Sequence, residues 1–108
     1  MNDITAEIIK ELATDRKNIN LTLHSLDRFR ERGIHISDIQ NVLLYGEIIE
    51  QYPDDYPFPS CLELGLSIAN RPLHVCCGVG DNKLWIITAY YPDNSKWESD
   101  NKTRKAVE

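Results

Sequence analysis

Apolar and polar residues alternate without a break in the second half of the chain. From Cys61 to Ile68 every second residue is leucine or isoleucine, a period that is typical of a strand with one buried face. The pattern predicts that these apolar side chains face the core and that Glu63 faces away from it. A further strand is predicted at residues 47–52. The three prolines of residues 53–59 predict a loop after it.

Apolar residues recur every three or four positions in the first half of the chain and predict short helices. The spacing indicates helices over residues 3–14, 23–32 and 37–45. Thr22 is the expected N-cap of the second helix, and Gly33 is expected to end it. Residues 15–20 are polar and predict a loop.

Residues 71–92 predict a β-hairpin whose register decides which side chains share a face. With a two-residue loop, Gly80 pairs with Lys83 and His74 shares a face with Trp85 and Ile87. With a three-residue loop, His74 joins Thr88 and Tyr90. We favour the three-residue loop because it also groups a second set of apolar residues as a core face: Leu73, Val75, Cys77, Trp85, Ile87 and Ala89.

These elements predict an α+β fold in which two or three N-terminal helices pack on a four-stranded antiparallel sheet. A chain of 108 residues is long enough for one core, so we expect a single domain over residues 1–108. Trp97 is expected to anchor an otherwise polar C-terminal tail through its ring. The predicted parts are a helix and linker at 1–20, helices at 21–46, the sheet at 47–92 and the tail at 93–108.

Composition and charge limit the possible partners. The net charge of −5 comes entirely from residues 47–70, which hold five acids and no Lys or Arg, so a basic surface can still form elsewhere. The three cysteines are expected to be reduced packing residues, since Cys76 and Cys77 are neighbours on a strand and point to opposite faces. No apolar run spans a membrane and no signal peptide is apparent, so we expect a cytoplasmic protein without membrane contact.

Candidate chemistry begins with a stripe on the second helix. His24, Arg28 and Arg32 are spaced four residues apart and therefore line up along one side of it. They are either a solvated face or an anion-binding stripe suited to phosphate. We find no spacing typical of a metal site and expect no cofactor.

Four separated motifs resemble a family of small prokaryotic domains of unknown function that is distantly similar to RelE-like and MqsR-like toxin ribonucleases. The motifs are His24-x3-Arg28-x3-Arg32-Gly-Ile, Gly46-Glu-Ile-Ile-Glu-x-Tyr-Pro-Asp-Asp, Pro72-Leu-His-Val and Ile87-Thr-Ala-Tyr-x-Pro-Asp followed by Trp97. The resemblance covers residues 22–104 and implies a RelE-like, barnase-like fold. It also implies the toxin of a toxin–antitoxin pair, held by a small antitoxin protein and acting on mRNA.

The implied reaction is metal-independent cleavage of RNA, in which a ribose 2′-hydroxyl attacks the neighbouring phosphate. Such cleavage needs a base, an acid and cations around the phosphate. The resemblance implies the catalytic set His24, His74, Arg28, Arg32, Thr88 and Tyr90. Arg71, Lys83 and Arg104 are expected to bind RNA. The alternative is a non-catalytic protein-binding or regulatory domain that uses the same groove.

Overall fold

The computed structural model of the protein describes residues 3–106. Its elements run in the order α1 (Ala6–Ala13), a 3-10 turn η1 (Arg16–Asn18), β1 (Ile19–Asn20), α2 (Leu23–Glu31), α3 (Ile36–Tyr45), β2 (Glu47–Tyr52), β3 (Ser60–Leu66), β4 (Pro72–Gly80) and β5 (Lys83–Tyr90). The predicted α+β class and N-terminal helices are confirmed. None of the helices within residues 3–106 is both long enough and apolar enough to cross a membrane.

In the part of the chain that the structure describes, the sheet has five strands rather than the four predicted. Their order is β1-β5-β4-β3-β2, and every neighbouring pair is antiparallel except β1 and β5, which are parallel. Ile19 pairs with Leu84 and Asn20 with Trp85. Strand β1 lies within residues 15–20, which were predicted to form a loop. It was not predicted because two residues are too few to show the two-residue period of a strand. It adds a short parallel edge to the predicted antiparallel sheet.

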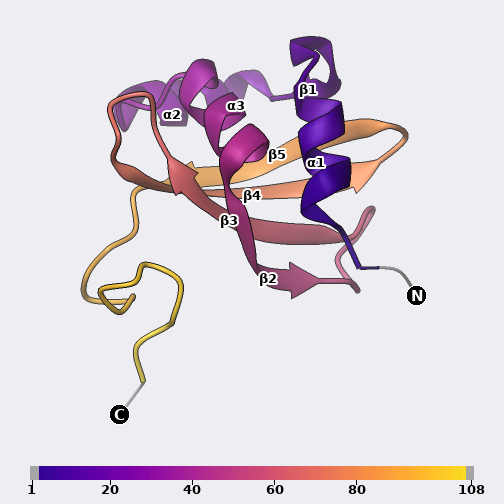
Figure 1. Cartoon of the computed structure of the whole chain (residues 1–108). Coiled ribbons are helices and arrows are strands. Elements are labelled where there is room, and N and C mark those ends of the chain that lie inside the picture. Colours follow the sequence, from indigo (N-terminus) through magenta and orange to yellow (C-terminus); the bar gives the residue numbers. More distant parts are fainter. Residues whose placement is uncertain (1–2, 107–108) are drawn as a thin grey trace.

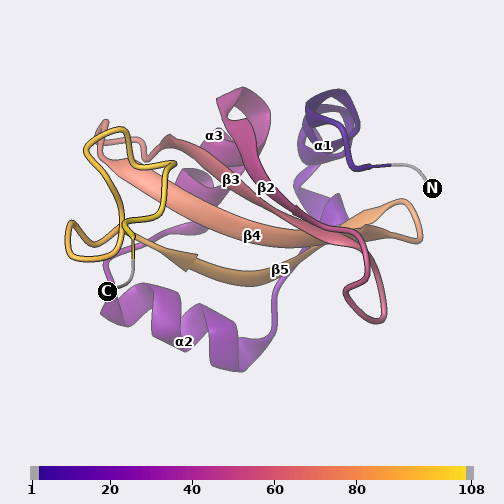
Figure 2. The same ribbon diagram turned by 90° about the horizontal axis from the view of Figure 1, so that it is seen from below.

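The helices and the C-terminal segment lie on opposite faces of the sheet. In Figure 1 the helices stand above the strands and the C-terminal segment, drawn in yellow, lies below them. Figure 2 looks up at the lower face, where this segment covers one end of the sheet. We call this lower face the open face. The core lies between the helices and the upper face and contains Ile9, Ile39, Leu43, Leu73, Val75 and Leu84.

Strand β3 faces the opposite way from the sequence prediction. Glu63 pairs with Val75, and Gly65 with Leu73, so both residues point toward the helices. The reason is the close approach of α3: a Cβ on Gly65 would lie 3.0 Å from the Cα of Val42. The leucines therefore occupy the open face, where Leu62 is buried and Leu66 is exposed. The prediction that Glu63 faces solvent was wrong.

The β4–β5 hairpin has a two-residue loop, and a β-bulge then changes its register. Asp81 and Asn82 both have positive φ, as a tight hairpin turn requires, and Gly80 pairs with Lys83. The predicted three-residue loop was therefore wrong. The pairing shifts by one residue at Ile87, and beyond it Cys76 pairs with Thr88 and His74 with Tyr90. Trp85 and Ile87 consequently lie outside the helix-covered core, where Leu84 and Ile86 are found instead.

Helix α2 begins and ends where the sequence predicts. The hydroxyl of Thr22 accepts the Ser25 N–H at 3.0 Å. Gly33 has a φ of 71°, and just after it the Ile34 N–H donates to the Phe29 carbonyl at 2.8 Å. Arg32 is the C-cap of the helix, and this position brings its side chain to the end of β5.

Candidate functional site

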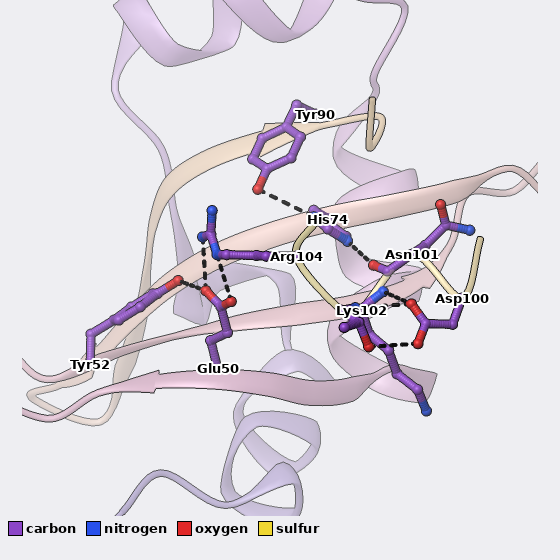
Figure 3. A network of polar contacts seen from close by, with 9 residues as sticks. Glu50, Tyr52, His74, Tyr90, Asp100, Asn101, Lys102 and Arg104 are labelled. Carbon is purple, nitrogen blue, oxygen red and sulfur yellow. Dashed lines mark hydrogen bonds and ion pairs between the residues drawn. The ribbon is translucent and has the colours of Figure 1, made fainter. Parts of the chain in front are cut away.

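The polar residues of the open face gather beneath the C-terminal segment. The register after the bulge places His74 and Tyr90 side by side on this face, and alternation along β2 adds Glu50 and Tyr52. The segment 93–106 then lays Asn101 and Arg104 over them (Figure 3). Trp97 of the same segment packs against His74. The site therefore joins three strands and a tail that has almost no regular structure.

His74 is fully buried between Tyr90 and the tail. Its Nε2 lies 2.6 Å from the Asn101 carbonyl oxygen, and its Nδ1 lies 3.2 Å from the Tyr90 hydroxyl. A carbonyl only accepts, so Nε2 carries the proton, and Nδ1 of the neutral ring accepts from Tyr90. Burial lowers the pKa of His74, with the hydrogen bond to Asn101 opposing this effect. The ring of Trp97 covers His74 in an edge-to-face arrangement, with the two ring centres 4.5 Å apart.

An ion pair beside the histidine connects the tail to β2. Arg104 donates from Nε and Nη2 to the two oxygens of Glu50 at 2.8 and 2.9 Å, which is a bidentate pair. This contact lowers the pKa of Glu50, and its carboxylate also accepts the Tyr52 hydroxyl. Burial, assisted by that hydrogen bond, raises the pKa of Tyr52 to about 12. Glu50 is therefore a carboxylate and Tyr52 a neutral phenol at pH 7.

A pocket of about 390 Å³ opens between α2, the end of β5 and the tail. Three basic residues line it, with Asp93 as the one acid among its lining residues. Arg32 donates from Nη1 to the Ala89 carbonyl at 2.7 Å, and this hydrogen bond holds its guanidinium against the end of β5. Burial raises the pKa of Tyr90, so its phenol remains protonated. We call this the cationic pocket, and its lining is Arg32, Tyr90, Tyr91, Asp93, Lys96, Trp97 and Arg104.

The stripe of α2 does not converge on this pocket as a whole. Arg32 lines it, whereas His24 and Arg28 are exposed and are not among its lining residues. At 1.5 Å per residue, His24 lies about 12 Å along the helix from Arg32. His74 is sealed beneath Trp97. The expectation that both histidines meet at one phosphate is therefore not supported by the geometry.

The remaining predicted residues are spread around this region. Thr88 shares the open face with His74 and Tyr90, as predicted, but lies two residue pairs away from them. It is half-buried and outside the lining of the cationic pocket. The guanidinium of Arg71 stacks on the ring of Tyr91, 3.7 Å from its centre. Lys83 is exposed at the hairpin turn, at the other end of β5. Arg104 alone of the three predicted RNA-binding residues lines the cationic pocket.

Four groups of the site were not predicted from the sequence, two of them on β2 and two in the tail. Glu50, Tyr52, Lys96 and the Asn101 carbonyl were not among the candidates. The two-residue spacing of Glu50 and Tyr52 on a predicted strand could have placed them on one face. No comparable signal exists for the tail, because it lacks a repeating pattern. Within residues 3–106 no cluster of three or more His, Cys, Asp or Glu side chains could hold a metal ion.

Residues 21–91, about two thirds of the chain, match the model of the domain of unknown function DUF4258. The chain belongs to the DUF4258 family. No curated protein and no solved structure matches it significantly. The DUF4258 region supplies Arg32, Glu50, His74 and Tyr90, whereas Trp97 and Arg104 come from outside the matched residues. The cationic pocket of this DUF4258 protein is thus completed by its own C-terminal tail.

Proposed function

We propose that the cationic pocket binds a phosphate of RNA and that the protein is an endoribonuclease toxin of a toxin–antitoxin pair. The observation that carries the proposal is that Arg32, Lys96 and Arg104 line one pocket together with Tyr90. Guanidinium forks and an ammonium are the side chains that best neutralise a phosphate. With Asp93 counted, the lining keeps an excess of positive charge although the whole chain is acidic.

Tyr90 and His74 form a pair suited to removing the proton of a ribose 2′-hydroxyl. Because Tyr90 donates its own proton to His74 Nδ1, the phenol oxygen is free to accept a hydrogen bond from the ligand. As the 2′-oxygen attacks phosphorus, its proton passes to the Tyr90 oxygen and the tyrosine proton passes to His74. The Asn101 carbonyl holds the ring in the tautomer that this transfer needs.

The cations complete the proposed reaction. Arg32 and Arg104 stabilise the negative charge that grows on the phosphoryl oxygens. The P–O5′ bond breaks, and the leaving 5′-oxygen takes a proton from the Lys96 ammonium, which leaves a 2′,3′-cyclic phosphate and a 5′-hydroxyl. Water then returns a proton from His74 to Lys96. Apart from this water, the groups that donate or accept protons in the proposed reaction are side chains of the protein.

The sequence motifs resemble a family of domains that is distantly similar to RelE-like and MqsR-like toxins, and this resemblance supports the proposal. We propose accordingly that mRNA in the cytoplasm is the substrate and that a small antitoxin protein holds the toxin inactive. In this proposal Arg32, Tyr90 and His74, all from the predicted catalytic set, take part in the reaction. His24, Arg28 and Thr88 do not take part.

Binding without cleavage is the second candidate function. Glu50 already occupies two donor nitrogens of Arg104, and Trp97 shields the imidazole. Both features favour a regulatory domain that holds its ligand in the same groove.

Induced expression in bacteria separates the two functions. The toxin account predicts that the wild-type chain stops growth and that Tyr90→Phe, which keeps the ring but removes the proton path, restores it. Arg28→Ala is the matched control and should remain toxic, because Arg28 does not line the pocket. Normal growth with the wild-type chain at a confirmed level of soluble protein would reject the toxin function.

A further inference from the structure

A second pocket lies at the opposite end of the open face from the cationic pocket. It has a volume of about 400 Å³ and is formed by the proline-rich loop and the β4–β5 hairpin. Phe58 and Trp85 stack within it, with ring centres 5.8 Å apart and planes inclined by 23°. We call it the aromatic pocket, and its lining is Asp55, Tyr56, Pro57, Phe58, Gly78, Asp81, Trp85 and Ile87.

Contacts with the loop and the strand hold this pocket in shape. The Val79 N–H donates to the Pro59 carbonyl at 3.0 Å, and the Trp85 indole N–H donates to the Gly80 carbonyl at 3.1 Å. Phe58 packs so closely on β4 that a Cβ on Gly80 would lie 2.1 Å from its ring. A pocket that is already formed binds with less ordering of side chains.

The pocket offers apolar surface that nothing within residues 3–106 covers. Tyr56 is 92% exposed and Ile87 is 50% exposed. The adjoining hollow continues this surface across the open face past Tyr52 and Cys76. Exposed aromatic and aliphatic side chains gathered around a concave site are typical of a surface that binds another molecule.

Charge around the pocket indicates what kind of molecule fits. Asp54, Asp55 and Asp81 surround it, and the loop belongs to residues 47–70, which contain no Lys or Arg. Lys83 pairs with Gly80 and therefore lies on the same face of the sheet. The three aspartate carboxylates and the Lys83 ammonium give this region a net negative charge. This balance repels a nucleic acid backbone and attracts cations. The charge is opposite in sign to that of the cationic pocket.

We infer that the aromatic pocket binds a basic segment of a partner protein, which inserts one bulky apolar side chain between Tyr56 and Trp85. Its neighbouring Lys or Arg side chains pair with the three aspartates at the rim. The inference does not depend on the proposed ribonuclease activity, because the two pockets share no lining residue.

A labelled synthetic peptide with one phenylalanine between flanking arginines tests this inference by fluorescence anisotropy. We expect a Kd on the order of 10–100 μM that weakens as salt is added. Tyr56→Ala and Asp54→Lys should each weaken binding about tenfold, and circular dichroism should show an unchanged fold, because both residues are exposed. Tyr45→Ala is the matched control, since Tyr45 is 73% exposed and does not line the aromatic pocket.

Three results would overturn the inference. These are no binding at about 1 mM peptide, equal binding of a peptide with glutamates in place of the arginines, and affinity that Tyr56→Ala leaves unchanged. A single-stranded RNA that binds and loses affinity on Tyr56→Ala would reassign the pocket to nucleic acid. Tyr90→Phe should bind the peptide like the wild type, which keeps this test separate from that of the ribonuclease.

Discussion

The Tyr90 hydroxyl lies 3.2 Å from Nδ1 of His74, across a strand pair that exists only because β5 carries a bulge. The two-residue loop alone would pair His74 with Ala89 and turn Tyr90 to the helix-covered face. The extra residue at Ile87 restores the pairing of His74 with Tyr90. One residue thus decides whether the Tyr90 phenol lies on the same face of the sheet as His74.

We expect Tyr90→Phe to destabilise the fold as well as affect function. The substitution leaves Nδ1 of a buried imidazole without its partner, which costs about 1–3 kcal/mol of unfolding free energy. Urea denaturation measures this change. Tyr91→Phe is the control, because its hydroxyl makes a 3.4 Å contact with the Gly33 carbonyl at an exposed position and should cost less. Equal losses in the two variants would contradict the buried hydrogen bond.

Arg32 and Arg28 provide a matched pair on one helix. Both are arginines of the same stripe, but only Arg32 reaches the cationic pocket. We expect Arg32→Ala to lower RNA cleavage about 100-fold and Arg28→Ala to leave it nearly unchanged. Single-turnover rates on one RNA would show this difference. Similar losses from both would mean that the whole stripe contacts RNA, as the sequence motif suggested.

Glu63 predicts an unusual dependence of stability on pH. Its carboxyl is fully buried and has no hydrogen-bond partner among residues 3–106, and burial raises its pKa from 4.5 to about 8. Between these two values the folded state holds a proton that the unfolded state has lost. The contribution of Glu63 to stability is therefore fully present below about pH 4.5 and is lost as the pH rises through 8.

Glu63→Gln should remove this loss. Relative to the variant, the wild type should lose roughly 3 kcal/mol of unfolding free energy between pH 5 and pH 8. Glu47→Gln is the control, because Glu47 is exposed and paired with Lys102. If the unfolding free energies of the wild type and Glu63→Gln changed with pH in parallel, the carboxyl of Glu63 would have to be hydrogen-bonded or exposed to solvent, which would contradict the prediction.

We expect that no side chain at position 80 can be accommodated unless Phe58 moves. A methyl group at this position overlaps the phenyl ring, so Gly80→Ala must move Phe58 away from Trp85. We expect a cost of about 1–3 kcal/mol and a shift in tryptophan emission. Phe58→Ala in the same background should remove most of the penalty, since it removes the overlapping ring. An additive double variant would contradict the proposed contact.

In this protein the sequence predicts the positions of helices and strands well, but predicts less well which face of each strand points to the core. Helix α2 begins and ends as expected because Thr22 and Gly33 act locally. The face of β3 was reversed because its leucines suggested the core side, whereas α3 approaches so closely that only small residues fit beside Val42. The aspartate and asparagine of the hairpin turn indicated a loop without fixing its length, and nothing in the composition marked the bulge.

Only part of the candidate site was predicted, because local sequence patterns do not show which distant residues meet. His74, Tyr90, Arg32 and Arg104 were identified from residue type and motif. Glu50 and the Asn101 carbonyl reach them through long-range contacts that no local pattern encodes. His24 was included because it shares a helical stripe with Arg32, although a stripe two turns long extends beyond one pocket.

The most direct test of the ribonuclease account is to incubate the purified chain with single-stranded RNA in EDTA and to identify the product ends. The account predicts cleavage that leaves 2′,3′-cyclic phosphate and 5′-hydroxyl ends, with a rate at least about 100-fold lower for Tyr90→Phe. RNA that stays intact, or cleavage at an equal rate by Tyr90→Phe, would contradict it.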